Sequence, residues 1–231
     1  INLTFPENKI TCIVGPSGCG KSTLLKTLNR LIDNVDDVEI DGQIMIGSQN
    51  IIGAKYSDLI ELRRRVGLVP QRPCPLPMSI FDNVAYGCRI HGMHTKKSEL
   101  NDVVEKYLTE VGLWEEVKDR LQSSAMRLSI GQQQRLCLAR SLAVEPDFIL
   151  ADEATSALDP VSSKTVEDLF VKLKENYSII MVTHTLRQAL RIADYAVFLY
   201  LGEVIETGDA AQVFGEPREE LTKKYLAGVF S

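Results

Sequence analysis

The sequence predicts an α/β fold in which a mainly parallel sheet is covered by helices on both faces. Two observations support this prediction. Short apolar, β-prone runs alternate with helical segments at both ends of the 231-residue chain. From residue 79 to 143 helical signals dominate, which indicates a helical part inserted into the sheet domain. Apolar residues make up 45% and charged residues 25% of the chain, as in ordinary globular proteins.

The first third of the chain predicts two strands, two helices and a hairpin. A strand is expected at residues 9–14, and a glycine-rich loop and a helix over 23–31 follow it. Residues 38–46 (VEIDGQIMI) carry a turn-prone Asp-Gly pair in their middle, which predicts a hairpin turning there. A helix over 56–65 and a short buried strand over 66–69 come next.

The rest of the chain predicts an irregular segment and a helical part, followed by a return to alternating strands and helices. Residues 72–78 hold three prolines and are expected to be irregular. Residues 101–111 place apolar side chains at the spacing of an amphipathic helix. Strands and helices then alternate again: strands over 148–151, 178–183 and 195–201, helices over 161–174 and 185–192.

Charge and apolar pattern exclude several classes of protein. The formal net charge is −5, which argues against nucleic acid as the main partner, because phosphate-backbone binding needs a basic face. The five cysteines form no C-x-x-C pair and indicate reduced thiols. The longest apolar runs are far shorter than the roughly 20 residues of a membrane-spanning helix, so any membrane crossing is expected from another chain.

A phosphate-binding loop is predicted between the first strand and helix. Residues 15–23 read GPSGCGKST and match the pattern G-x-x-x-x-G-K-[ST]. Glycines let consecutive N–H groups surround an anion, and the helix adds its positive end. Lys21 is placed to reach the β- and γ-phosphates, and the Ser22 hydroxyl to ligate Mg²⁺. The expected nucleotide-binding residues are Gly15, Pro16, Ser17, Gly18, Cys19, Gly20, Lys21, Ser22 and Thr23.

Two carboxylates end the strand expected over 148–151. Asp152 lies where open α/β sheets bind ligands and is the candidate to hold Mg²⁺. Glu153 points differently from Asp152, because a strand alternates its faces, and is the candidate to orient or deprotonate an attacking water. The long interval between Lys21 and Asp152 indicates a large insertion between the two halves of a nucleotide site.

The inserted segment resembles ABC-type ATPases. Residues 128–135 (LSIGQQQR) are similar to their LSGGQQQR signature, and further motifs follow the family's order. These are VPQ before the helical part (Q-loop), SALD after Asp152 (D-loop) and TH after the strand SIIMV (switch histidine). The resemblance implies a P-loop NTPase of ABC type with a mainly parallel sheet core and a small antiparallel β part. It further implies one ATP-binding domain over 1–231, with 1–71 and 147–231 as a RecA-like core and about 72–146 as a helical subdomain.

Within that family, the chain is most similar to the ATP-binding subunits of bacterial phosphate importers. The similar segments include TLNR (27–30), SIFDNVAYG (79–87) and GQQQRLCLARSLAVEP (131–146). The resemblance implies an ATP-hydrolysing motor subunit, peripheral on the cytoplasmic face of the inner membrane. Its implied partners are transmembrane permease subunits, a second ATP-binding subunit and, indirectly, a solute-binding protein, with no nucleic acid.

The family mechanism implies a role for each motif residue. The nucleotide lies between two subunits, so the signature of one chain faces the ATP of the other. The implied assignments are Glu153, His184 and Gln71 as catalytic, Ser129, Gly131 and Gln132 as nucleotide contacts in the partner's site, and Ser22, Gln71 and Asp152 as Mg²⁺ ligands. Residues 71–79 are the candidate for one wall of the groove that receives a short helix of the membrane subunit.

Departures from the family pattern keep two alternatives open. Ile130 stands where the family usually has glycine, and it either crowds the partner's γ-phosphate or points away. The first case gives a slow or inactive ATP-gated dimerisation module; a non-transport ABC ATPase is the other alternative. The aromatic residue that stacks on adenine in the family lies on a strand before the loop, and with Ile1 so close to Gly15 no residue of this sequence is assigned that role. The arginines at 63–65 are expected at a helix end.

Overall fold

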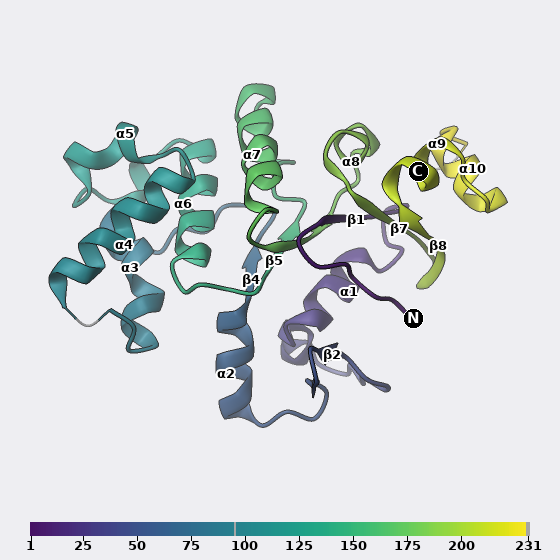
Figure 1. Ribbon diagram of the computed structural model, residues 1–231, viewed down its shortest axis with the longest axis horizontal. Coiled ribbons are helices and arrows are strands. Elements are labelled where there is room, and N and C mark those ends of the chain that lie inside the picture. The colour runs from purple at the N-terminus through teal and green to yellow at the C-terminus, as the bar shows by residue number, and fades with distance from the viewer. Residues whose placement is uncertain (95, 230–231) are drawn as a thin grey trace.

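A six-stranded sheet organises the chain (Figure 1). The computed structural model describes residues 1–94 and 96–229, with only the backbone at 56 and 57. The strand order is β4-β5-β6-β1-β7-β8, and all neighbours are parallel except β7 and β8. The strands are β1 Ile10–Val14, β4 Val66–Val69, β5 Phe148–Asp152, β6 Ser178–Val182, β7 Tyr195–Tyr200 and β8 Glu203–Asp209. The predicted α/β fold with a mainly parallel sheet is confirmed.

Helices gather into two groups along the sheet. Those packed with the sheet or following it are α1 Lys21–Leu28, α2 Tyr56–Arg65, α7 Pro160–Leu173, α8 Leu186–Ile192, α9 Ala210–Gly215 and α10 Glu220–Leu226. Those between β4 and β5 are α3 Ile80–Ile90, α4 Lys97–Glu110, α5 Trp114–Val117 and α6 Ile130–Leu142. Short 3₁₀ turns cover Leu31–Asn34, Lys118–Arg120 and Ala125–Arg127. Figure 1 shows the second group at one end of the molecule, with β8, α9 and α10 at the other.

The two faces of the sheet bury separate cores. In β1, Ile10, Cys12 and Val14 join the larger apolar cluster, which reaches into the helices between β4 and β5. Ile13 faces the opposite way and packs with Leu25 of α1 in the second cluster. This alternation follows from the two-residue period of a strand, and burial on both faces explains why the parallel strands read as continuous apolar runs.

The N-terminus of α7 is fixed by a side-chain cap and a proline. Asp159 caps α7 by accepting the backbone N–H groups of Val161 (3.0 Å) and Ser162 (3.1 Å), and Pro160 takes the first helical position. Hydrogen bonds, first from the Ser162 side chain and then from backbone N–H groups, lower the pKa of Asp159 below its usual value. The cap starts α7 one residue before the expected position.

The predicted hairpin over 38–46 was wrong in position. The two-stranded sheet pairs β2 Met45–Ile46 with β3 Gln49–Asn50 in antiparallel register, so the chain turns at residues 47 and 48. Gly47 supplies the left-handed backbone (φ 59°) that such a turn needs. The Asn50 side chain fixes the register by accepting the N–H groups of Ile44 and Ile52, and the Asp-Gly pair upstream forms only a local bend.

The arginines at 63–65 end α2, as predicted. Their guanidinium groups are engaged inside the chain, by the Arg30 carbonyl oxygen (2.8 Å), Glu61 (2.6 Å) and Asp147 (2.7 Å). Within residues 1–94 and 96–229, none of the helices combines the length and apolar character that a bilayer crossing requires.

Candidate active site

The loop between β1 and α1 is shaped by glycines in left-handed conformations. Gly18 and Gly20 have φ values of 77° and 101°. Gly15 (φ 153°) is constrained by space: a Cβ added there lies 2.0 Å from the Leu199 carbonyl oxygen of β7. The loop is therefore packed against the sheet at its first residue and open at Gly18, where an added Cβ meets nothing within 4 Å.

We expect Gly15→Ala to lower the free energy of unfolding by about 3 kcal/mol, because backbone of both β1 and β7 must move to admit the methyl group. Gly18→Ala is the matched control in the same loop, and its left-handed backbone costs only about 1 kcal/mol. Urea unfolding of both variants measures the difference. Equal losses in the two variants would show that the contact with Leu199 does not constrain the loop.

Lys21 lies buried at the centre of the loop. Its side chain is 6% exposed, and Nζ donates to the carbonyl oxygens of Gly15 and Pro16, each at 2.8 Å. The ammonium group is thus held against the loop backbone at the start of α1, beside the helix end that attracts anions. A positive charge fixed at this point is what recognition of a phosphate chain requires.

Ser22 and Asp152 meet although they are far apart in sequence. The Ser22 hydroxyl donates to Asp152 Oδ1 at 2.7 Å. β5 lies two strands from β1, and both strands end at the same edge of the sheet. Hydroxyl and carboxylate oxygens are suitable ligands for Mg²⁺. In nucleotide sites most of the other ligands of Mg²⁺ are water molecules and phosphate oxygens. In the described part of the chain no cluster of three or more His, Cys, Asp or Glu could hold a metal, so a site here needs the phosphate oxygens as well.

The three expected catalytic residues converge on Glu153. Its Oε2 accepts the amide of Gln71 at 2.8 Å and lies 3.0 Å from His184 Nδ1. Glu153 itself adopts a left-handed backbone (φ 49°), and its N–H donates to the Val182 carbonyl oxygen of β6 at 2.9 Å. A non-glycine residue in this region is uncommon, and here the turn aims the Glu153 side chain toward Gln71 and His184. Side chains that follow three neighbouring strands are thereby brought to one point beside Asp152.

The signature segment begins α6. Ser129 caps the helix by accepting the Gln132 N–H (3.3 Å), while Gln132 Oε1 accepts the Ser129 N–H (2.9 Å), a reciprocal cap. Gln132 also donates to Glu116 at 2.7 Å. Burial alone would raise the pKa of Glu116, but hydrogen bonds from Gln132 and Arg135 outweigh it and lower that pKa. The structure thus engages the Gln132 side chain within the helical part.

Gly131, an expected site residue, and Ile130, the departure from the family pattern, have different surroundings in the signature. A Cβ added at Gly131 lies 2.7 Å from Ser162 Oγ, so α6 and α7 pack closely there. Ile130 is the first residue of α6, and it is 54% exposed. Figure 1 shows α6 and α1 on opposite sides of α7, so one chain does not bring the signature to its own phosphate-binding loop.

Sequence reasoning missed Tyr225, which contacts the phosphate-binding loop at the Gly15 backbone. Its ring stacks on Phe198 of β7 with centroids 4.8 Å apart. Burial raises the pKa of Tyr225, and a hydrogen bond with the Gly15 backbone acts in the opposite direction. This residue lies on α10, near the C-terminal end of the described chain, and only an aromatic residue in a short amphipathic segment pointed to it.

Comparisons with known proteins agree with this geometry. The family model described as "ABC transporter" matches residues 1–156. The phosphate import ATP-binding protein PstB 1 of Bacillus licheniformis is 56% identical over 230 residues, covering 100% of this chain and 88% of that protein. The phosphate import ATP-binding protein PstB 3 of Streptococcus pneumoniae is 54% identical, covering 100% and 91%.

Solved structures show the same fold. The cbiO1 protein of Clostridium perfringens, part of the ABC transporter complex cbiONQ, superposes with a TM-score of 0.79 at 26% identity, covering 99% of this chain and 88% of that one. The ATP-binding cassette MJ0796, solved as a dimer in a post-hydrolysis state with ADP and Pi, gives 0.77 at 29% identity, covering 91% and 89%. The chain therefore belongs to the ABC transporter family, within which it is an ATP-binding ATPase.

Proposed function

We propose that this chain is the ATP-hydrolysing motor subunit of a membrane importer for inorganic phosphate. The observation that carries the proposal is the convergence of Gln71 and His184 on Glu153, next to the Ser22–Asp152 pair. The relatives named above as phosphate import ATP-binding proteins, matched over the whole chain, support the choice of solute. A solute-binding protein outside the membrane delivers the phosphate, and the motor works at the cytoplasmic face.

The residues divide the work on ATP. The loop N–H groups and Lys21 bind the β- and γ-phosphates. Ser22, Asp152 and Gln71 are the residues that would hold Mg²⁺, which when bound would neutralise charge on the phosphate oxygens. Glu153 orients and deprotonates the attacking water, and His184, 3.0 Å from its carboxylate, keeps Glu153 in line with the γ-phosphate.

A second copy completes each site. The N-terminus of α6 presents Ser129 and the backbone of Gly131, and the positive helix end attracts the γ-phosphate of a partner's ATP. Each chain therefore supplies two half-sites, one around Lys21 and one around Ser129. ATP closes the dimer, and loss of the γ-phosphate opens it, because the two states bind the nucleotide differently.

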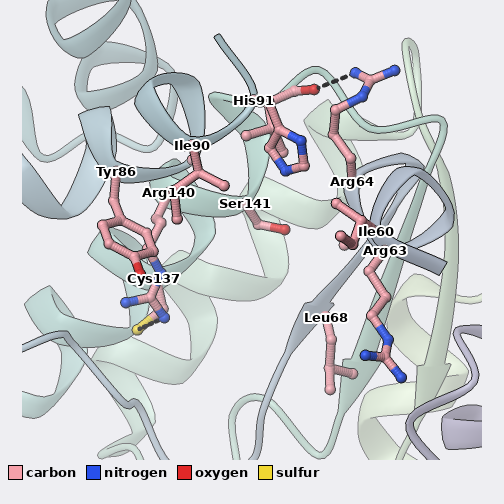
Figure 2. Close-up of a pocket in the computed structure, with 13 residues that line it drawn as sticks. Ile60, Arg63, Arg64, Leu68, Tyr86, Ile90, His91, Cys137, Arg140 and Ser141 are labelled. Atoms are coloured by element: carbon pink, nitrogen blue, oxygen red, sulfur yellow. Dashed lines mark hydrogen bonds between the residues drawn. The ribbon is translucent and has the colours of Figure 1, made fainter. Parts of the chain in front are cut away.

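A groove between α2 and α3 is the proposed seat of the permease. Figure 2 shows its walls, and its volume is about 370 Å³. Ile60, Tyr86 and Ile90 line it and are 48%, 41% and 58% exposed, far more than apolar side chains of a closed core. Arg140 adds a cationic rim, and Arg64 lines the groove as an ion pair with Glu61. A short amphipathic helix of a transmembrane subunit, apolar on one face and acidic at its edges, fits this lining.

The sequence placed one wall of this groove at residues 71–79, and the lining residues come from elsewhere. The two are nevertheless connected: Arg140, which lines the groove, donates to the Cys74 carbonyl oxygen at 3.0 Å. Asn83 of α3 also pins this segment, through the N–H (2.8 Å) and carbonyl oxygen (3.1 Å) of Leu76. Movement of a docked helix can thus reach the segment that begins with Gln71.

Phosphate uptake by proteoliposomes tests the proposal. The chain is co-expressed with the permease subunits of its own organism, and uptake is driven by ATP on the side of the motor. Ile90→Asp is expected to abolish co-purification with the permease and uptake, while Leu201→Asp, also at an exposed apolar residue (77%), leaves both intact. ATP-driven uptake of another solute but not of phosphate would overturn the choice of solute.

The departure from glycine at Ile130 raises one second candidate, an ATP-gated dimer with little turnover, and the surroundings of Ile130 argue against it. Its β-branched side chain sits without strain at the first position of α6, because its backbone is helical and the side chain is exposed. We therefore expect Ile130→Gly to change kcat by less than about threefold and to cost about 1 kcal/mol of stability through the added backbone freedom. ATPase assays and urea unfolding measure both effects. A tenfold or greater rise in kcat would instead support the slow dimerisation module.

A further inference from the structure

A buried polar network lies behind Glu153 and His184. It links the turn after β5, the turn after β6, and helices α7 and α8 through Thr155, Thr183, Gln188, Glu167 and Arg191. Thr155, Thr183, Gln188 and Glu167 are between 1% and 8% exposed. Buried polar groups stay buried at low cost only when they are hydrogen-bonded, so the pairing within this network has to be specific.

Gln188 is the residue that joins the two catalytic turns. Its Oε1 accepts the Thr183 hydroxyl at 2.7 Å, and its Nε2 donates to the Thr155 hydroxyl, also at 2.7 Å. Thr183 immediately precedes His184, and Thr155 lies two residues after Glu153. One side chain on α8 therefore spans the backbones that carry Glu153 and His184.

The direction of each hydrogen bond in this link is fixed. The Thr183 oxygen accepts the N–H of Thr185 at 3.0 Å, so its hydroxyl proton is directed to Gln188. Glu167 takes the second proton of the Gln188 amide at 3.3 Å. The amide of Gln188 thus has one orientation only, with its oxygen toward β6 and its nitrogen toward β5 and α7.

Glu167 and Arg191 hold Gln188 in place. The Glu167 side chain, on α7, is 2% exposed, and Arg191 of α8 binds both its carboxylate oxygens at 2.8 and 2.9 Å. These hydrogen bonds raise the pKa of Arg191 further above its ordinary value, so the guanidinium keeps its charge beside the buried carboxylate. Because Gln188 and Arg191 lie one turn apart on α8, the same carboxylate fixes the rotation of that helix.

We propose that Gln188 is a positioning residue that sets the distance between Glu153 and His184, with the Glu167–Arg191 pair holding its side chain in register. This inference rests on the proposed catalytic roles of Glu153 and His184. Neither Gln188 nor Glu167 needs to touch the nucleotide. The phosphate-binding loop and the Ser22–Asp152 pair are absent from the network, so substrate binding and the positioning of the base are separable.

Gln188→Met tests the proposal, because methionine keeps the length and volume but makes none of the three hydrogen bonds. We expect kcat for ATP to fall about tenfold to hundredfold, as displaced catalytic groups do, while KM stays within about twofold. Leu190→Met on the exposed face of α8 is the matched control and should keep wild-type kinetics. An unchanged kcat in Gln188→Met would overturn the proposal. So would a fall in kcat that comes with a raised KM and a lowered melting temperature, because that pattern indicates general structural damage.

A double-mutant cycle checks the path of the coupling. Thr155→Val removes the link on the β5 side, and adding it to Gln188→Met is expected to cause less than a further twofold loss in kcat. Fully additive losses from the two substitutions would mean that they act independently, against the proposed bridge.

An NMR measurement separates this proposal from the proposed function. The chain has three histidines, and the His184 imidazole resonances can be assigned by substituting it. Gln188→Met is expected to shift and broaden those resonances, and Leu190→Met to leave them unchanged. If the wild type shows no ATP turnover but the His184 signals respond in this way, the proposed function fails while the positioning role stands. If the signals do not respond, the positioning role fails.

Discussion

Replacing Glu153 by glutamine is expected to lower kcat for ATP hydrolysis by about 10³-fold, within the range lost when a general base is removed. Glutamine keeps the size of the side chain and can still accept a hydrogen bond from Gln71, so the local packing is preserved. ATP binding should persist, because the loop and Lys21 are untouched. Steady-state hydrolysis, measured beside equilibrium binding of a fluorescent ATP analogue, separates the two effects.

Glu175→Gln is the control for this substitution, since Glu175 is an exposed carboxylate on the segment between α7 and β6. It should behave as the wild type in both assays. If Glu153→Gln retained more than a tenth of wild-type turnover, Glu153 would not be the base, and the water would have to be activated by another group.

Replacing Lys21 by alanine is expected to weaken ATP binding about 100-fold, equivalent to about 2.7 kcal/mol. The substitution removes the charge that the Gly15 and Pro16 carbonyl oxygens hold at the loop centre, and it leaves those oxygens without their donor. Titration with the same fluorescent analogue gives the affinity. The increase in melting temperature on adding ATP should shrink in parallel.

Lys26→Ala provides the comparison, because Lys26 lies on the same helix and is exposed to solvent. Its affinity for ATP should match that of the wild type within a factor of two. If both substitutions weakened ATP binding equally, the total positive charge of α1 would determine the affinity, and Lys21 would not contact the phosphates specifically.

Local sequence patterns predicted the helices and strands whose bounds depend on nearby residues. They failed for the β2–β3 hairpin, whose turn depends on residues outside the predicted segment. The bounds of α2 and β4 match those expected, because an amphipathic run, a cluster of basic residues and an apolar run follow one another there. The hairpin was misplaced because the Asp-Gly pair is a strong turn signal, yet Gly47 and the side chain of Asn50 set the register. Strand β8 and helices α9 and α10 had no expectation at all.

The candidate site divides in the same way. The loop around Lys21 is contiguous, and the carboxyl ends of parallel strands share an edge, so Asp152 and Glu153 could be placed near it from the sequence. Gln188 and Tyr225 could not, because their roles depend on side chains distant in the sequence, Thr155 for Gln188 and Phe198 for Tyr225, which they meet only in the folded chain. The division into a RecA-like core and a helical subdomain stays a prediction.

The central claim is that each ATP site is shared by two chains, and mixing two inactive variants tests it most directly. Glu153→Gln disables the half-site around Lys21, and Ser129→Glu places a negative charge at the end of α6 that we propose to face the partner's γ-phosphate. Each variant alone should hydrolyse almost no ATP. A mixture forms heterodimers in which one site joins two intact halves, so hydrolysis should return and rise with total protein concentration. A mixture as inactive as its components, while the wild type turns over at the same rate per chain at every concentration, would contradict the shared site.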